Sequence, residues 1–408
     1  MSKPNVLIIA DQRDIKFLNI NKKSEYWNIF WKIINYDKLN SNKCIDELKY
    51  IIQEYDIDFV LYSRNDQIAN KIRIGPITKK LKTGYSSFSG IDTNHRISEM
   101  KKCFDDFMEC DNNFRLDLPS LKKRNFYFEN KGSFSLVFDT EQIGCIRYGL
   151  PRILRLLNEF EVKATFFVTN LMKKIYPNIV DNLSAEGHEI GLHGRWHEHL
   201  SRYNKDEQII LIEDMKKDFR VDIYSANFIG RSNEDTIHAL IKNEIKYFYF
   251  PAINYYRFFC YPKISTAPFS ISTKGDGSIW MIPISVETYG LPWFSTKNMI
   301  DSAYNESLKS NRHITILCHP FRDGNLQHIE STKKMIKYLI IDKKLKPVIV
   351  KDLALCGEEY VDPNKIHNLV PRMELKDLLP KTRHDYIGII PENFIMLNKI
   401  IMKKYTLW

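Results

Sequence analysis

Two acidic residues and a cluster of histidines are the side chains of this sequence whose types and spacing suit metal chemistry. Asp139 and Glu141 follow an apolar run, and three of the 11 histidines, His193, His197 and His199, fall within seven residues. Imidazole nitrogens and carboxylate oxygens are the usual ligands of catalytic zinc, which keeps one position open for water. Such a metal lowers the pKa of the bound water and polarises a carbonyl group. The pattern therefore indicates a hydrolytic metal centre.

Repeated secondary structure must position these side chains. From residue 133 onward, short apolar runs predict strands, and segments with apolar residues at helical spacing separate most of them. Repeated strand–helix units imply a parallel sheet with crossover helices, most simply a barrel. The predicted strands are 134–138, 164–168, 189–192, 227–229, 246–250, 280–285, 314–318 and 347–350.

The candidate residues share one place in this predicted barrel. Asp139, His193, Arg231 and His319 each follow the carboxyl end of a predicted strand. In parallel barrels that edge carries the active site. We therefore expect these four side chains to meet at the mouth of the barrel.

The same region resembles the polysaccharide deacetylase (NodB-homology) family. The resemblance covers roughly residues 133–352 and implies a distorted, incomplete (β/α)7-type barrel with about seven strands. Four elements in the family's order carry it, namely the turn Phe138-Asp139-Thr140-Glu141, the KATFF run at 163–167, the GHEIG run at 187–191 and the His193-x-x-x-His197 loop.

The resemblance also implies roles for individual residues. Asp139 corresponds to the catalytic base, and His193 and His197 correspond to ligands of a divalent metal, expected to be Zn²⁺. His319, in a late His-Pro element, corresponds to the catalytic acid. Arg231 corresponds to the arginine that positions the base.

Two departures from the family pattern bear on these roles. The family usually has a second Asp as a metal ligand, and Thr140 stands at that position. We expect Glu141 to replace it, because side chains two residues apart at a strand end point the same way. The alternative is that His199 supplies the ligand or that the metal is absent. Arg231 stands two residues late and lacks the family's following proline.

Residues 1–110 are predicted to form a small α/β domain of Rossmann-like type. Asn5–Ala10 and Ile57–Tyr62 are predicted strands, whereas Ile45–Tyr55 and the aromatic stretch Tyr26–Ile34 have helix-like patterns. Neither a dinucleotide-binding glycine motif nor a P-loop occurs. The predicted division is a linker at 111–132, the barrel at 133–356 and an extension at 357–408.

The C-terminal extension contains one strongly apolar segment. Glu392–Lys404 is apolar nearly all round and carries three lysines near its end. We expect a helix packed on the protein or on a second copy, which would make a homo-oligomer. A membrane-surface contact is the alternative, although the segment is only weakly basic.

Composition limits the compartment and the partners. The net charge of +10 comes from scattered lysines without an arginine-rich or basic-aromatic block, so no nucleic-acid partner is expected. Seven cysteines form no Cys-x-x-Cys pair, which is typical of reduced thiols. No signal peptide or membrane span is evident, so the sequence predicts a cytoplasmic protein.

These observations predict a metal-dependent hydrolase that removes an N-acetyl group from a sugar or glycan precursor. Two alternatives stay open. One is a C–N hydrolase acting on a non-sugar amide or cyclic ureide, and the other is a catalytically silent carbohydrate-binding protein that kept the barrel.

Overall fold

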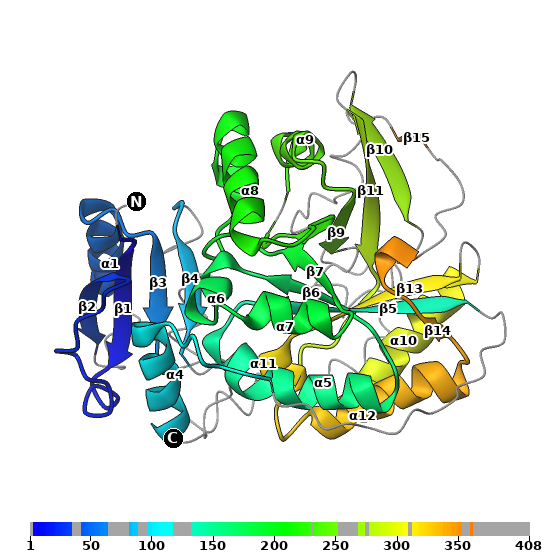
Figure 1. The fold of residues 1–408 in the computed structure, drawn as a ribbon, viewed down its shortest axis with the longest axis horizontal. Helices are drawn as coiled ribbons and strands as arrows, with labels where there is room; N and C mark the ends of the chain where they lie inside the picture. Colours follow the sequence, from blue (N-terminus) through cyan, green and yellow to red (C-terminus); the bar gives the residue numbers. More distant parts are fainter. Residues whose placement is uncertain are drawn as a thin grey trace.

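The structure is a computed structural model that describes residues 3–34, 42–63, 81–88, 97–116, 132–230, 232–251, 268–273, 277–308, 312–352 and 360–361. Within these residues the chain forms a four-stranded sheet and an eleven-stranded sheet. Figure 1 shows the smaller sheet standing beside the larger one, with strand β4 (Gly84–Ser87) on the side that faces it.

The larger sheet confirms the predicted parallel barrel. Its core strands pair in parallel with their neighbours in the order β13, β5, β6, β7, β8, β9 and β11. These strands are β5 (Ser133–Thr140), β6 (Thr165–Val168), β7 (Glu189–Leu192), β8 (Ser225–Asn227), β9 (Tyr247–Pro251), β11 (Gly277–Ile284) and β13 (His313–Cys318).

One bent strand brings the two edges of this parallel array together. β11 pairs with β9, and after the single residue Ser285 the chain continues as β12 (Val286–Glu287), which pairs with β13. The Ser285 N–H also donates to the carbonyl of Thr315, 2.9 Å away, on β13. Counting β11 and β12 as one strand gives seven strands around the barrel, as the family resemblance implied.

Short strands extend or flank the barrel. β10 (Phe269–Thr273) runs antiparallel to β11, and β15 (Tyr360–Val361) adds to β10. β14 (Lys346–Pro347) pairs with the start of β5. The predicted last strand was too long, because the chain already turns into a 3-10 helix at Val350–Asp352. The predicted strand at 227–229 also began too late, since β8 ends at Asn227.

Alternation along the strands separates two apolar layers. Val137 of β5 lies in a small buried cluster with Phe167, Tyr249, Ile284 and residues of other strands. The strand's even-numbered residues Phe134, Leu136 and Phe138 instead belong to the main core shared with the helices. Because successive side chains of a strand point to opposite faces, Asp139 shares the face of Val137.

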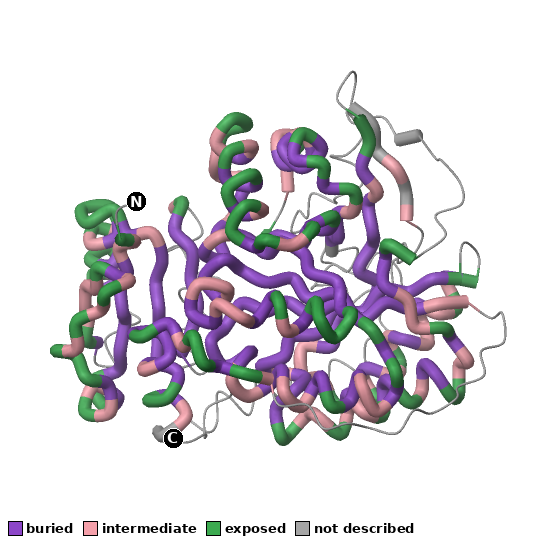
Figure 2. The backbone as a smooth tube through the Cα atoms, in the orientation of Figure 1, coloured by how far each residue is buried: buried purple, intermediate pink, exposed green. Residues whose placement is uncertain are grey.

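Helices cover the outside of the barrel (Figure 1). Figure 2 shows the central strands of the barrel buried, whereas the helices around them carry many exposed residues. The helices are α5 (Leu150–Glu159), α6 (Asn170–Ile175), α7 (Ile179–Ala185), α8 (Lys205–Phe219), α9 (Glu234–Lys242), α10 (Trp293–Ser307), α11 (Pro320–Asp323) and α12 (Ile329–Lys337). Shorter helical turns are Cys145–Gly149, Leu200–Arg202 and Tyr338–Asp342.

The smaller sheet confirms the α/β character predicted for the N-terminal residues. Its four strands are all parallel, in the order β2-β1-β3-β4. They are β1 (Asn5–Asp11), β2 (Asn28–Ile34), β3 (Phe59–Tyr62) and β4, with helices α1 (Asn42–Glu54) and α4 (Ile97–Glu109).

One N-terminal prediction was wrong. The stretch Tyr26–Ile34 looked helical, but residues 28–34 form β2 and pair in register with β1, Asn5 opposite Asn28 and Asp11 opposite Ile34. Pairing with a distant strand overrides a local pattern, and the aromatic and β-branched residues of β2 suit a half-buried strand.

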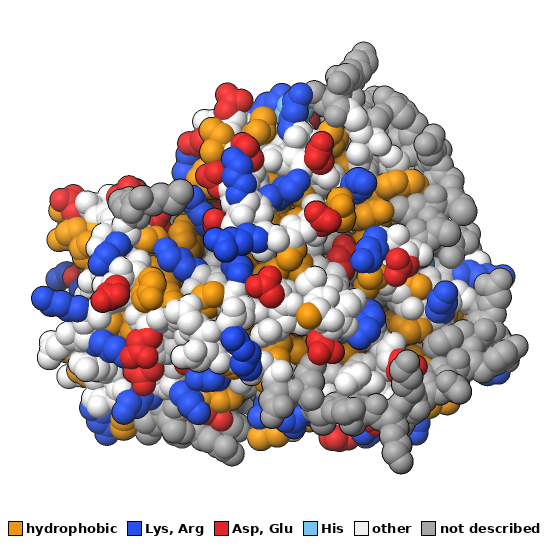
Figure 3. All heavy atoms as spheres, in the orientation of Figure 1, with side chains coloured by type: hydrophobic (Ala, Val, Ile, Leu, Met, Phe, Trp, Pro, Cys, Tyr) orange, Lys and Arg blue, Asp and Glu red, His pale blue; other side chains and the backbone are white. Residues whose placement is uncertain are grey.

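The surface carries both signs of charge. On the face drawn in Figure 3, Lys and Arg side chains lie interspersed with Asp and Glu. This agrees with the scattered lysines of the sequence. The apolar segment 392–404, predicted to be a helix, lies outside the described residues.

Candidate metal centre

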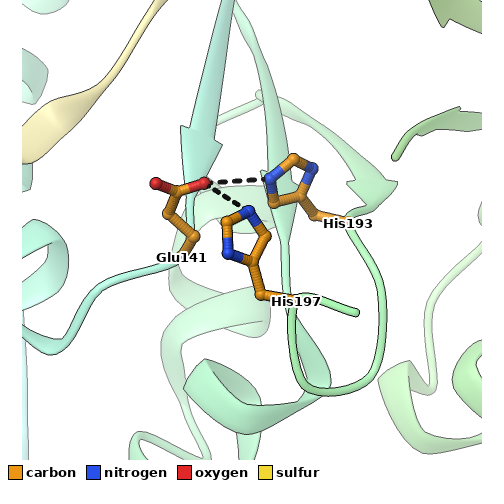
Figure 4. A group of neighbouring side chains, drawn as sticks. All are labelled: Glu141, His193 and His197. Atoms are coloured by element: carbon orange, nitrogen blue, oxygen red, sulfur yellow. Dashed lines mark hydrogen bonds and ion pairs between the residues drawn. The ribbon is translucent and has the colours of Figure 1, made fainter. Parts of the chain in front are cut away.

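Glu141, His193 and His197 converge on one point at the carboxyl edge of the barrel (Figure 4). The Oε2 atom of Glu141 lies 2.7 Å from Nε2 of His197 and 3.2 Å from Nε2 of His193. Each of the three residues offers one ligand atom, and these atoms all lie within 4.8 Å of one another. All three side chains are buried, with only 2% of each residue exposed.

The end of β5 directs the two acids into this site. Asp139 lies on the strand, Thr140 ends it, and Glu141 follows directly. Thr140 points to the other face, and its hydroxyl lies 3.5 Å from the carbonyl oxygen of Phe138. Its alternation with Asp139 and Glu141 is the reason why a hydroxyl at position 140 does not join the group of ligand atoms.

The loop after β7 presents the two histidines. His193 directly follows the strand, and positive φ angles of 88° at Gly194 and 65° at His197 turn the chain back on itself. The buried carboxylate of Glu198 accepts hydrogen bonds from the backbone N–H groups of Arg195 (3.0 Å) and Trp196 (2.5 Å). A left-handed conformation at a histidine is uncommon, so this loop is held by specific contacts.

A hydrogen bond to the backbone selects the ring nitrogen that His193 turns to the site. Nδ1 of His193 lies 2.6 Å from the carbonyl oxygen of Asn227, at the end of β8. A carbonyl can only accept, so Nδ1 carries a proton and Nε2 faces Glu141. Such an arrangement fixes the ring orientation of histidine ligands in metal sites.

Asp139 and His319 lie beside this group. The side-chain amide of Asn227 donates to Oδ1 of Asp139 over 2.8 Å. Oδ2 of Asp139 lies 3.7 Å from Nε2 of His319. A second group of possible ligand atoms accordingly contains Asp139, Glu141 and His319, all buried.

The turn from β13 into α11 holds His319. Its backbone N–H donates to Oδ2 of Asp323 over 2.7 Å, and the Thr288 hydroxyl donates to the other oxygen of the same carboxylate over 2.7 Å. The ring of Tyr289 meets the imidazole of His319 edge-on, with the centroids 4.7 Å apart. Asp323 therefore links the β13 turn to the segment that follows β12.

The pKa shifts follow from buried charges at short range. Burial by itself raises the pKa of the Glu141 carboxyl, but His197 and His193 hold that pKa well below its usual value. Burial lowers the pKa of the His193 imidazole, whereas the carboxylates of Asp139 and Glu141 raise it, and the net pKa is about 9. The site therefore favours positive charge at its centre.

The donor set fits a divalent metal. Two imidazole Nε2 atoms and one carboxylate oxygen make the three-ligand set of catalytic zinc sites, with a position left for water. The orientation of His193 by a backbone carbonyl is the second observation in favour, and buried carboxylates require a cationic partner. Glu141, His193 and His197 are the residues that would hold the metal.

His199, the alternative ligand, does not join this group. His199 begins the short helix Leu200–Arg202, and its ring packs beside Gly230, where an added Cβ would lie 2.2 Å from Nδ1. It belongs to neither group of neighbouring ligand atoms in the described residues. Arg231 lies outside the described residues.

Sequence reasoning missed three residues that shape the site. Asn227, Glu198 and Asp323 all act by hydrogen bonds to the predicted residues or to their loop. Asn227 was not recognised because the predicted strand 227–229 began at this residue, whereas β8 ends there. The carboxylates of Glu198 and Asp323 accept hydrogen bonds from backbone N–H groups, and no residue spacing in the sequence predicts that role.

The fold and this geometry define the class, an α/β barrel with an acid–imidazole centre at the carboxyl ends of its strands. Residues 129–221 match the family described as polysaccharide deacetylase. The family resemblance drawn from the four sequence elements is therefore confirmed.

Curated relatives agree with this family. A peptidoglycan-N-acetylglucosamine deacetylase of Bacillus cereus is 34% identical over 121 residues, which are 29% of this chain and 41% of that protein. A second protein of the same description and organism is 34% identical over 80 residues, 20% of this chain and 27% of that protein. The chain spans less than half the length of these relatives.

Solved structures show more distant likenesses. A family 4 carbohydrate esterase from Streptomyces lividans, in complex with acetate, is 13% identical, with 54% of this chain and 93% of that chain covered and a TM-score of 0.37. An allantoinase is 14% identical, with 54% and 88% covered and a TM-score of 0.45. With TM-scores below 0.5, these likenesses add nothing to the fold that the strand order itself gives.

Membrane-spanning segments were sought in the described part of the chain. None of its helices has both the length and the apolar character needed to cross a bilayer.

Proposed function

We propose that this protein is a metal-dependent deacetylase that hydrolyses the N-acetyl group of a sugar or glycan precursor, with Zn²⁺ as the metal. The convergence of Glu141, His193 and His197 within 4.8 Å, beside Asp139 and His319, carries the proposal. The peptidoglycan deacetylases that resemble the chain support the choice of an N-acetylated sugar as the substrate.

The reaction adds water across the amide bond. A bond forms between the water oxygen and the carbonyl carbon, the C–N bond breaks, and acetate and a free amine leave. When bound, the metal would lower the pKa of the water and act as a Lewis acid on the carbonyl. The remaining proton transfers fall to side chains of the chain itself.

We assign these proton transfers to Asp139 and His319, and their geometry supports the assignment. Asn227 holds Oδ1 of Asp139, which directs the carboxylate and leaves Oδ2 toward His319. Asp139 takes the proton of the attacking water, and His319 delivers a proton from Nε2 to the departing nitrogen. The role of Arg231 in positioning the base stays part of the proposal.

The silent carbohydrate-binding alternative rested on the missing acid at position 140. Because Thr140 points away from the site and Glu141 lies against both histidines, the site has its carboxylate without an acid at 140. An active enzyme is therefore favoured. A C–N hydrolase acting on a non-sugar amide or ureide would use the same residues. A test of substrates therefore distinguishes this hydrolase from a sugar deacetylase.

A cytoplasmic precursor, for example a nucleotide- or lipid-linked sugar, is the substrate that we propose. The five cysteines among the described residues are buried and form no disulfide, which suits a reducing compartment. No nucleic-acid partner is proposed. Self-association through the segment 392–404 stays a prediction from the sequence.

Metal content and acetate release test the proposal together. We expect the purified protein to contain about one equivalent of zinc per chain, and to release acetate from N-acetylglucosamine-containing sugars but not to open cyclic ureides. His193→Ala, which removes a ligand, is the matched control. A parent protein that binds no divalent metal would refute the proposal, and opening of ureides without acetate release would favour the other hydrolase.

A further inference from the structure

We infer that strand β4 of the N-terminal sheet positions the metal ligands, so that the N-terminal residues are part of the catalytic site. The inference rests on the proposed function, since it concerns the same metal. β4 lies between the rest of its sheet and the barrel (Figure 1). Its residues reach both sides of the candidate metal centre.

On the first side, β4 holds the turn that carries Glu141. The Ser86 hydroxyl donates to the backbone carbonyl of Glu141 over 2.8 Å and lies 3.3 Å from Oε1 of Gln142. The Ser87 N–H donates to the same Gln142 oxygen. Three contacts from two β4 residues thereby tie this strand to the ligand-bearing turn of the larger sheet.

Gln142 connects β4 to the carboxylate of Glu141. Its Nε2 donates to Oε1 of Glu141 over 3.3 Å, while Oε2 of Glu141 faces the two imidazoles. One oxygen is thus directed by Gln142 and the other is presented to the site. Both residues are buried, so little water competes for these bonds.

On the second side, β4 supports the loop that carries His197. The rings of Tyr85 and His197 meet edge-on, with centroids 4.7 Å apart. Gly84 packs against the backbone of Trp196, where an added Cβ would lie 1.9 Å from the carbonyl oxygen. Only glycine permits this approach of the two backbones.

Trp196 anchors the same loop in the N-terminal core. Its ring stacks on Phe59 of β3 with centroids 5.1 Å apart, and Trp27 meets it edge-on at 6.4 Å. The neighbouring His197 has a φ of 65°, a conformation that costs on the order of 1 kcal/mol or more. Burial of the adjacent Trp196 side chain in the N-terminal core offsets that cost.

Positioning of the metal ligands by β4 and simple packing of β4 against the barrel lead to different expected results. Partners of metal ligands tune ligand orientation, and their loss typically weakens metal affinity by roughly 10–100-fold. A contact that serves only to join the two sheets would lower thermal stability without a matching loss of affinity. Metal affinity, compared at equal metal-free stability, therefore distinguishes the two roles.

The experiment uses the full-length protein with Ser86→Ala and Gln142→Met. The matched control is Thr83→Val, which removes a buried hydroxyl directly before β4 that donates to the carbonyl of Ile57 and not to the barrel. Zinc dissociation constants are measured by competition with a chromophoric chelator, and melting temperatures on metal-free protein. We expect Gln142→Met to bind zinc roughly 10–100-fold more weakly and Ser86→Ala to show a smaller loss in the same direction. The zinc dissociation constant of Thr83→Val should stay within about twofold of the parent's, because this hydroxyl contacts Ile57 and no partner of a metal ligand.

Parent-like zinc affinity in both Ser86→Ala and Gln142→Met would overturn the inference. A parent that binds no zinc would instead refute the proposed function, so the two failures are distinguishable. Should Gln142→Met not fold, Gln142→Asn keeps an amide but is one methylene too short to hold both partners. The same loss of affinity is expected for it, and unchanged affinity there would count against the inference.

Discussion

Oε2 of Glu141 lies 2.7 Å from Nε2 of His197, although one residue follows β5 and the other lies in the loop after β7. Those two strands are not neighbours, because β6 lies between them. The contact is therefore made beyond the carboxyl end of β6, at the edge of the barrel. It places Glu141, and not Thr140 or His199, among the atoms that can hold a metal.

This relationship predicts that Glu141 is needed for metal binding and that His199 is not. In a metal titration, Glu141→Ala should lose zinc affinity by at least roughly tenfold, because two imidazoles alone leave one ligand short. His199→Ala should titrate like the parent. Wild-type affinity in Glu141→Ala together with loss in His199→Ala would transfer the ligand role to His199.

The two histidines of the loop should each be indispensable. Loss of one imidazole leaves too few protein ligands for a three-ligand site, so we expect elemental analysis of His193→Ala and His197→Ala to show strong metal depletion. Circular dichroism should show an intact fold, since the barrel does not depend on these side chains. Full zinc occupancy in both variants would rule out this site.

Substitution of Asp139 or His319 should lower the catalytic rate without reducing metal binding. Asp139→Asn is expected to keep its zinc and to lose roughly 10²–10⁴-fold in kcat, the usual contribution of one proton-transfer group. His319→Ala should lose a similar factor, most strongly for substrates with poor leaving groups. Steady-state kinetics on metal-loaded protein checks both, and near-normal turnover of Asp139→Asn would remove it from the mechanism.

The burial of His313 predicts that the fold loses stability in acid. This effect does not involve the candidate metal centre. It begins β13, is fully buried, and lies 2.9 Å through Nδ1 from the Ser133 hydroxyl. Burial lowers the pKa of this imidazole from 6.5 to about 4. The folded state therefore holds the ring neutral. The contribution of the neutral ring to the free energy of unfolding is present above pH 6.5 and is lost as the pH falls toward 4.

The lowering of the His313 pKa from 6.5 to about 4 corresponds to about 3 kcal/mol of unfolding free energy. Urea unfolding from pH 7 to pH 4 should show a flatter pH dependence for His313→Gln than for the parent, because Gln does not titrate. Carboxylates that titrate in both proteins cancel in the comparison. Parallel curves for the two proteins would show that His313 does not contribute.

Local sequence was sufficient for much of the barrel. Apolar runs located most strands of the parallel array, and the order of the family elements placed Asp139, His193, His197 and His319 at one edge. The period of two in an extended strand also selected Glu141 over Thr140, because that rule depends only on neighbouring residues. The domain boundaries, Arg231 and the segment 392–404 stay predictions.

Tertiary structure alone decided the features that depend on distant pairing. Tyr26–Ile34 has a helix-like pattern, yet residues 28–34 pair with β1 as a strand. The joining of the barrel's two edges depends on the bend at Ser285. The contacts of Asn227 with Asp139 and of Ser86 with Glu141 join segments that no local spacing relates. Such hydrogen bonds form only when the folded chain brings distant segments together. The periodicity of apolar residues in the sequence indicates only which face of a helix or strand is buried.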